Sequence, residues 1–216
     1  AYMFTPIHFR EQSVGYIILK NGHFLYDNPY YYDIHCTIVR MLENRFKQLQ
    51  LERALGKLQE LYNHDPLTGA YNRIAYNEWI RPAFLDYSRQ GIICALVFLD
   101  ADNFKRLNDT FGHEYGDKVL QRIVAVLKEQ CPEGGYVCRY GGDEFITFFP
   151  HATPANTNEY VQNVQELLGK ERIEVSMGTK LTQPGDGESL DNYLALADER
   201  MYQQKQQRKE QSHDAQ

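Results

Sequence analysis

The fold of this 216-residue chain is decided by one short stretch, Arg139-Tyr140-Gly141-Gly142-Asp143-Glu144-Phe145. Mostly apolar residues flank it at 136–138 and 145–149, which favours two paired β-strands. The two glycines supply the positive φ that a tight hairpin turn needs, and they let a ligand approach the backbone. We therefore expect a β-hairpin whose tip carries two carboxylates, Asp143 and Glu144. Such a concentration of negative charge favours a bound cation.

A second acidic strand end lies upstream. Residues 92–99 are all apolar, and the run stops at Asp100. A run of this length without alternation predicts a strand buried on both faces, in the middle of a sheet, and it is too short to span a bilayer. Together with the acidic hairpin, Asp100 forms an oxygen-ligand site of the kind preferred by hard cations that bridge phosphates. A solvated acidic strand end is the better interpretation of Asp100 alone, but not of both elements together.

Between about Asp65 and about Lys209, the chain resembles the GGDEF family of diguanylate cyclases. Three blocks carry the resemblance in matching order and spacing: 65–73 (DPLTGAYNR), 99–117 (LDADNFKRLNDTFGHEYGD) and the acidic hairpin. The resemblance implies an α+β fold with a palm-like, mostly antiparallel central sheet flanked by helices, as in nucleotide polymerases and class III nucleotide cyclases. It also implies a reaction in which two GTP molecules condense to cyclic di-GMP and release two pyrophosphates.

The resemblance implies a magnesium site, with Mn²⁺ as an alternative ion, made by Asp100, Ala101, Asp143 and Glu144. Asp100 and Asp143 would bind through their carboxylates. Ala101 would bind through its main-chain carbonyl, which does not depend on its side chain. Glu144 would be a further ligand or would accept the proton of the attacking 3′-hydroxyl group, and the sequence does not separate these roles. Phosphoryl transfer asks a protein mainly for positioning and for neutralisation of phosphate charge, which such a cluster supplies.

Other residues of the motifs are implied to hold the nucleotide. Lys105 follows Asp100 by five residues and would reach the β and γ phosphates, although a lone lysine would count as an ordinary exposed side chain. Asn108 and Asp117 would recognise guanine, because a carboxylate accepts from the N1 and N2 donors that adenine lacks. The remaining substrate contacts implied are Phe104, His113, Lys205 and Lys209. For the histidine, a structural role is an equal alternative.

Two departures from the family pattern concern regulation and phosphate binding. The inhibitory Arg-x-x-Asp site of many members falls on residues 132–135, where Pro-Glu-Gly-Gly has neither the arginine nor the aspartate. We therefore expect no product inhibition through that site. In the last helix, the family has a lysine and, four residues later, an arginine, with a glycine between them. Lys205 matches, Lys209 replaces the arginine and the glycine is missing, so that either Arg208 or Lys209 would contact the phosphates.

Periodicity predicts the elements between the motifs. An apolar stripe that begins at Val119 predicts a helix with Asp117 in its first turn. Residues 155–168 and the stretch from Leu190 onward predict two more helices, and residues 173–178 alternate like a strand.

The N-terminal third carries no chemical motif. Residues 14–19 and 24–26, on either side of Asn21-Gly22, predict a β-hairpin. A long helix is expected from Asp33 to Asn63. Coiled-coil spacing is kept in its second half by Leu51, Leu55, Leu58 and Tyr62. A strand pair that leads into such a helix resembles the end of a GAF-like sensory domain and its signalling helix.

These predictions divide the chain into four segments. They are a sensory-domain remnant at 1–32, a signalling helix at 33–63, a GGDEF catalytic domain at 64–209 and a disordered tail at 210–216. The chain starts at Ala1 in strand-like sequence, so we interpret it as a piece of a longer protein.

Bulk composition is compatible with this division. The net charge of −6 argues against nucleic-acid binding, and the four cysteines lack metal-ligand spacing, which favours reduced thiols in the cytoplasm. No signal peptide or membrane span is found, and membrane attachment of a parent protein is left open.

The sequence thus predicts a magnesium-dependent diguanylate cyclase that works as a homodimer, since one site holds one GTP and the reaction needs two. An inactive module that binds GTP or a partner for regulation is the main alternative. A class III adenylyl or guanylyl cyclase is a weaker one. The acidic cluster, together with Lys105, Asn108 and Asp117, argues against the inactive module.

Overall fold

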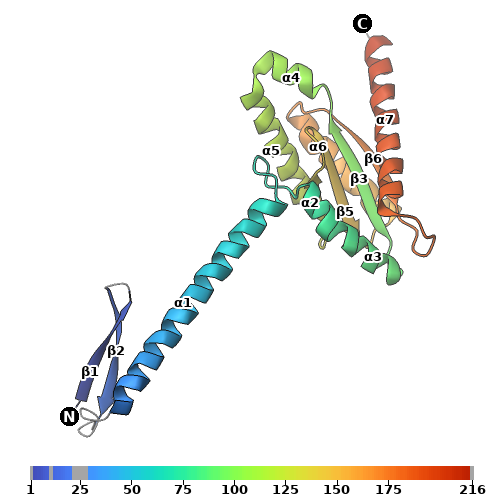
Figure 1. Cartoon of the computed structure of the whole chain (residues 1–216). Helices are drawn as coiled ribbons and strands as arrows, with labels where there is room; N and C mark the ends of the chain where they lie inside the picture. The colour runs from blue at the N-terminus through green and yellow to red at the C-terminus, as the bar shows by residue number, and fades with distance from the viewer. Residues whose placement is uncertain (1, 10–11, 21–28, 215–216) are drawn as a thin grey trace. The chain divides into compact units, whose positions relative to one another are not determined.

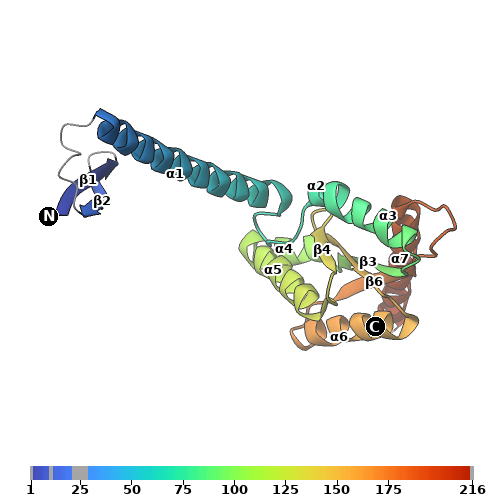
Figure 2. The ribbon, with the colours of Figure 1, turned by 90° about the horizontal axis from the view of Figure 1, so that it is seen from below.

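A computed structural model describes residues 2–9, 12–20 and 29–214 of the chain (Figures 1 and 2). The chain divides into two compact units, Ala1–Gln59 and Glu60–Gln216. Within the described residues, no helix combines the length and the apolar character that a bilayer crossing requires.

The first unit begins with an antiparallel hairpin of β1 (Tyr2–Phe9) and β2 (Gln12–Lys20). The predicted strand at 14–19 is part of β2, but it pairs with β1, which the sequence did not predict. Pro6 lies within β1, and a proline is tolerated there because each strand of a two-stranded sheet is an edge strand. The predicted partner at 24–26 and the Asn21-Gly22 turn lie outside the described residues.

A helix of 35 residues, α1 (Pro29–Asn63), follows the hairpin. It ends where the sequence predicted and begins four residues before the expected Asp33. Its apolar side chains are largely exposed, among them Leu51, Leu55, Leu58, Leu61 and Tyr62.

The second unit is built on a four-stranded sheet in the order β4-β5-β3-β6, with every pair antiparallel. Its strands are β3 (Cys94–Ala101), β4 (Tyr136–Arg139), β5 (Glu144–Pro150) and β6 (Val175–Leu181). All residues of β3 except Asp100 are buried, which confirms the inner strand predicted from its apolar run. The acidic hairpin is also present, as β4 and β5.

Helices cover both faces of this sheet (Figure 2). On one face, α5 (His113–Gln130) and α6 (Pro154–Lys170) pack on β3 through Val97 and Leu99. On the other face, a short π-helix, η1 (Tyr76–Ile80), packs with α3 (Arg81–Arg89) and α7 (Leu190–Asp214) around Leu96 and Phe98. The remaining helices are α2 (Arg73–Ala75) and α4 (Phe104–Phe111).

Three predicted boundaries are corrected. Because α5 begins at His113, Asp117 lies in its second turn and not in its first. β6 begins at Val175 and not at 173. The backbone of α7 is helical through Asp214, where we expected a disordered tail after about Glu210. Residues 203–211, which lead into that stretch, are all Gln, Lys, Arg or Glu and are good helix formers, so a polar sequence does not end the helix.

Candidate functional site

The predicted carboxylates meet at one end of the sheet. Asp100 on β3 is directly opposite Glu144, the first residue of β5. Side chains of directly opposed residues lie on the same face of a sheet, so these two carboxylates are neighbours. The amide of Ala101 donates to the carbonyl of Asp143 over 3.1 Å, which brings Asp143 to the same strand end.

The two hairpin glycines act differently from the prediction. Neither Gly141 nor Gly142 has a positive φ, so that expectation is wrong. A Cβ added to Gly141 would overlap the carboxylate of Glu144 and lie 3.3 Å from its Cβ, whereas Gly142 faces open space. Gly141 therefore leaves room for the Glu144 side chain, which would have to shift if a Cβ were added at this position.

Arg139 fixes this turn to the first motif block. Its guanidinium donates to the carbonyl of Gly142 (Nη2, 2.7 Å) and forms an ion pair with Asp65 (2.9 Å). The Asp65 carboxylate also accepts hydrogen bonds from the amide and hydroxyl of Thr68. Asp65 and Arg139 are both largely buried, so the 65–73 block supports the acidic hairpin rather than the chemistry directly.

A lysine of α7 partly neutralises the carboxylates. Lys205 Nζ forms an ion pair with Asp100 and lies 4.0 Å from Asp102. Burial raises the pKa of Asp100; Lys205 opposes this, while Asp143 and Asp102 add to it. Burial, followed by repulsion from Asp143 and Asp100, raises the pKa of Glu144. Burial alone would lower the pKa of Lys205, but bonding to Asp100 outweighs it and the pKa is raised. The carboxylates outnumber this lysine, so the cluster keeps a net negative charge.

This donor set fits Mg²⁺. Among the described residues, no group of three His, Cys, Asp or Glu side chains forms a ready-made metal cage. Mg²⁺ does not require one, because it keeps several waters and is usually held by one or two carboxylates and substrate phosphates. Two carboxylates and the carbonyl of Ala101 supply such a set. Burial and, after it, the neighbouring carboxylates raise the pKa values of Asp100 and Glu144, so a bound cation would stabilise both carboxylates in their ionised form.

The chain leaves β3 through Asp102 and Asn103 and enters α4 directly. Asn103 has a left-handed backbone (φ 56°) and provides no side-chain cap to the helix. The first amides of a helix have no partners inside it, so α4 presents donors that suit phosphate oxygens. Lys105 is exposed in the first turn of α4.

Two predicted guanine-binding residues lie on α4 and α5. The side-chain oxygen of Asn108 is buried and accepts no hydrogen bond from any described residue. An unsatisfied buried acceptor costs about 1–3 kcal/mol, so a donor supplied by a ligand would be favoured there. Asp117 is exposed one turn into α5, and His113 is exposed at the first residue of that helix.

Gly116 is a site residue that the sequence analysis missed. A Cβ at this position would overlap the Asn108 side chain and lie 3.2 Å from Cζ of Phe104. Gly116 therefore lets α5 approach both predicted nucleotide contacts. The available signal was a glycine inside a helical pattern, which costs about 1 kcal/mol relative to alanine and often has a packing or functional reason.

Arg208 and Lys209 are the two candidates for the last phosphate contact, and the structure describes the side chain of Arg208 alone. Arg208 Nη1 lies 3.4 Å from Asp102 and donates to the carbonyl of Val175 over 2.6 Å, so its guanidinium is engaged by the fold. The side chain of Lys209 lies outside the described residues.

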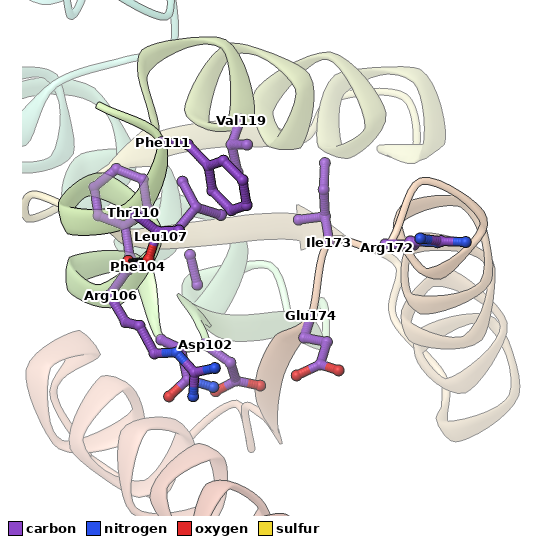
Figure 3. A pocket seen from close by; sticks show the side chains of 12 residues that line it. Asp102, Phe104, Arg106, Leu107, Thr110, Phe111, Val119, Arg172, Ile173 and Glu174 are labelled. Carbon is purple, nitrogen blue, oxygen red and sulfur yellow. Dashed lines mark hydrogen bonds between the residues drawn. The ribbon is translucent and has the colours of Figure 1, made fainter. Parts of the chain in front are cut away.

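A pocket of about 250 Å³ lies beside this cluster, between α4, the start of α5 and the segment 172–174 (Figure 3). Phe111 and Val119 lie toward one end of it in the view, and Asp102 and Glu174 toward the other. Of the predicted site residues, its lining contains only Ala101 and Phe104. The pocket is thus adjacent to the acidic cluster and is not the cluster itself.

Together, the fold and the cluster define an α+β domain with a candidate site for a divalent cation and phosphates. Residues 62–211 match the family model described as diguanylate cyclase, GGDEF domain. The chain therefore belongs to the GGDEF family.

Individual relatives agree with this assignment. The chain is 30% identical over 166 residues to diguanylate cyclase VdcA of Vibrio cholerae, which covers 72% of this chain and 48% of VdcA. It is 33% identical over 155 residues to the probable diguanylate cyclase DgcI of Escherichia coli strain K12, covering 69% of this chain and 33% of DgcI. It thus spans less than half the length of these two relatives.

A solved structure supports the fold. The coiled coil and GGDEF domain of DgcB from Caulobacter crescentus, in complex with c-di-GMP, superposes with a TM-score of 0.71 at 25% identity. The superposition covers 77% of this chain and 92% of the DgcB chain. The predicted antiparallel α+β architecture, including the long helix before it, is confirmed.

Proposed function

We propose that this chain contains the catalytic domain of a diguanylate cyclase, which condenses two GTP molecules to cyclic di-GMP and releases two pyrophosphates. The observation that carries the proposal is the meeting of Asp100, Asp143 and Glu144 beside Lys205, next to the open N-terminus of α4. Relatives at about 30% identity that are named diguanylate cyclases support the same activity.

The proposed chemistry is two identical nucleotidyl transfers. The 3′-hydroxyl oxygen of one GTP attacks the α-phosphorus of the other, the bond to the pyrophosphate breaks, and the hydroxyl proton passes to a carboxylate. Glu144 suits that acceptor role because its raised pKa brings its proton affinity nearer to the working pH. Mg²⁺, or Mn²⁺ in its place, would be held by Asp100, Asp143 and the carbonyl of Ala101 and would neutralise phosphate charge.

The remaining residues would bind and orient the substrate. Lys105 and Lys205 offer ammonium groups to the outer phosphates, and the amides of α4 offer donors to the same oxygens. The buried oxygen of Asn108 and the carboxylate of Asp117 would accept from the donors on guanine. His113 and Phe104 would border the base, and Lys209 would add charge at the phosphates.

A direct assay separates this function from the main alternative. Incubation with GTP and Mg²⁺, followed by chromatography of the products, should yield cyclic di-GMP and pyrophosphate, and chelation of the metal should abolish both. A regulatory module without activity would instead bind GTP and return it unchanged. Formation of cyclic mononucleotide would indicate a class III type of cyclase.

The Asp117→Asn variant tests base recognition. Asparagine exchanges an acceptor oxygen for an amide group, so each lost pairing should weaken discrimination for guanine over adenine by about 1–3 kcal/mol. Competition between GTP and ATP for binding measures the effect, and Asp109→Asn on the exposed side of α4 is the matched control. Unchanged selectivity would make Asp117 an ordinary helix carboxylate.

Cyclic di-GMP should not inhibit the protein by binding at the turn formed by residues 132–135. The turn is closed by a bond from the amide of Gly135 to the carbonyl of Pro132 (3.0 Å) and offers neither a guanidinium nor an aspartate. A Cβ at Gly135 would lie 2.9 Å from that carbonyl, so an aspartate does not fit the present turn. Initial rates should stay constant when micromolar cyclic di-GMP is added. Inhibition at such concentrations would mean that another surface binds the product.

For the first unit, we propose the end of a GAF-like sensory domain followed by a signalling helix. A hairpin that precedes α1 in the chain, and the exposed leucines of α1, support this assignment. Contact between two copies along α1 would produce the homodimer that the two-substrate reaction requires. In a longer protein, such an arrangement would link a signal to the distance between two catalytic domains.

A further inference from the structure

The C-terminal helix α7 runs along the outer edge of β6. β6 is the last strand of the sheet and pairs with β3 on one side only. An edge strand leaves a row of N–H and C=O groups without strand partners. Three side chains of α7 bond this row: Arg200 Nη1 donates to the carbonyl of Thr179 (2.7 Å), Gln204 Oε1 accepts from the amide of Met177 (2.7 Å), and Arg208 Nη1 donates to the carbonyl of Val175 (2.6 Å).

These three side chains, the edge ladder, are spaced to match the strand. They lie four residues apart on the helix and bond residues two apart on β6. Four helical residues advance about 6 Å and two strand residues about 6.8 Å, so the rungs stay in step over two turns. Gly178 permits the close approach, because a Cβ there would overlap the backbone of Ala197 and Met201. The edge ladder therefore specifies one register of α7 on β6.

Asp102 connects the last rung to the acidic cluster. Its side chain is only 9% exposed and accepts hydrogen bonds from the hydroxyl of Ser176 at 2.8 and 2.9 Å. It also lies 3.4 Å from Arg208 and 4.0 Å from Lys205. Asp102 thus holds the end of β3, the start of β6 and the site-facing turn of α7 together.

The register decides where Lys205 points. Lys205 directly follows the middle rung, Gln204, and forms the ion pair with Asp100. A slip of α7 by one residue would move the lysine by about 1.5 Å along the helix and turn it by about 100° about the axis. Its ammonium would then leave the strand end at which the carboxylates meet.

We propose that the edge ladder and Asp102 are positioning residues, which fix α7 in the register that holds the ammonium of Lys205 over the acidic strand ends for the outer phosphates of GTP. This inference rests on the proposed function of the site. It assigns a role to Asp102, a residue of the 99–117 motif that binds neither metal nor nucleotide in that proposal.

Binding of nucleotides that cannot react tests the inference. We would measure the affinity of 3′-deoxy-GTP and of GMP, with Mg²⁺, by calorimetry at a temperature where circular dichroism shows each variant folded. Gln204→Leu and Asp102→Asn should weaken 3′-deoxy-GTP about tenfold, in line with a misplaced charge-assisted phosphate contact. Both should leave GMP unchanged, because the monophosphate lacks the outer phosphates.

Three further variants complete the design. Gln207→Leu makes the same change at an exposed position on the same helix and should alter neither affinity. Gln204→Glu keeps an acceptor oxygen for Met177 and should restore most of the triphosphate affinity. Arg200→Gln removes the rung that is farthest from Lys205 and should give a smaller loss of triphosphate affinity. Because the side chain of Arg200 is exposed, this variant provides the test if the other variants do not fold.

The outcomes separate the inference from the proposed function. Unchanged 3′-deoxy-GTP affinity in folded Gln204→Leu, Asp102→Asn and Arg200→Gln, with normal wild-type binding, would overturn the inference and leave the function standing. Equal weakening of GMP and 3′-deoxy-GTP would indicate general loss of structure and would also overturn it. A wild-type protein that binds no guanine nucleotide would overturn the proposed function, and the inference with it.

Discussion

Replacing Asp143 with asparagine and Glu144 with glutamine should abolish cyclic di-GMP formation while the domain stays folded. The two carboxylates are proposed to hold Mg²⁺ and to accept the proton of the attacking hydroxyl. Removal of such groups takes away stabilisation that is greatest in the transition state, so we expect turnover to fall by about 10²–10⁴-fold per site. Initial rates from chromatography of the products measure this loss.

The same variants should not be less stable in the absence of metal. The pKa of Glu144 is raised by burial and by its carboxylate neighbours, so its ionised form is disfavoured in the folded state. An acid with a raised folded pKa costs stability above that pKa, and the cost disappears as the pH falls through it. Glu144→Gln removes the cost at neutral pH, so its melting temperature without Mg²⁺ should equal or exceed that of the wild type.

Glu159→Gln, an exposed carboxylate on α6, serves as the control and should change neither rate nor stability. Wild-type rates in a folded Asp143→Asn, Glu144→Gln double variant would remove the metal and base assignments together. A large fall in melting temperature would instead point to a structural role of the hairpin tip.

Asp100, Asp143 and Glu144 were predicted from local chain geometry, whereas the other site residues were implied by the resemblance to the GGDEF family. The apolar run before Asp100 and the hairpin around Asp143 and Glu144 each predict a strand by themselves, and antiparallel pairing then brings the strand ends together. Charge, strand length and turn composition are local properties, so no tertiary information was needed.

The features of the site that the sequence did not predict depend on contacts between side chains of different segments. Gly141 looks like a turn glycine, but it leaves room for the side chain of Glu144, and Gly116 leaves room for the side chain of Asn108 beside α5. The bonds between α7 and β6 join residues that are 21 to 33 positions apart in sequence. No sequence pattern distinguishes Gln204 from Gln203 or Gln207, because its role depends only on the hydrogen bond that it makes to the edge of β6.

The contacts between the end of α1 and the first motif block also join segments whose proximity the sequence did not predict. Asn72 donates through its side chain to the carbonyl of Tyr62 (2.6 Å) and caps α2 by accepting from the amides of Ile74 and Ala75. The adjacent Tyr71 exchanges backbone bonds with β4, accepting from the amide of Arg139 (2.7 Å). The first motif block thus joins the end of α1 to the strand that leads into the acidic hairpin.

Charged residues at Leu55 and Leu58 should therefore strongly lower activity at low protein concentration. Both side chains are more than half exposed on α1, and they belong to the stretch with coiled-coil spacing. Burying a leucine contributes about 1.5–3 kcal/mol, so a dimer that loses two from each copy and gains like charges should dissociate. Because each domain is proposed to provide one substrate, a Leu55→Glu, Leu58→Glu variant should lose activity at least about tenfold near the wild-type dissociation constant.

The measurement is activity against protein concentration, with the oligomeric state followed by analytical ultracentrifugation. Wild-type specific activity should rise with concentration and then level off as the dimer forms. Gln50→Glu, at an exposed position of α1 outside the predicted seam, should behave like the wild type. Replacing the first 50 residues of the double variant with a leucine zipper joined in register should restore activity, because the junction at Asn72 and the catalytic residues are untouched. Full activity of a strictly monomeric protein would exclude dimerisation through α1 as the control of this enzyme, and each domain would then have to bind both GTP molecules itself.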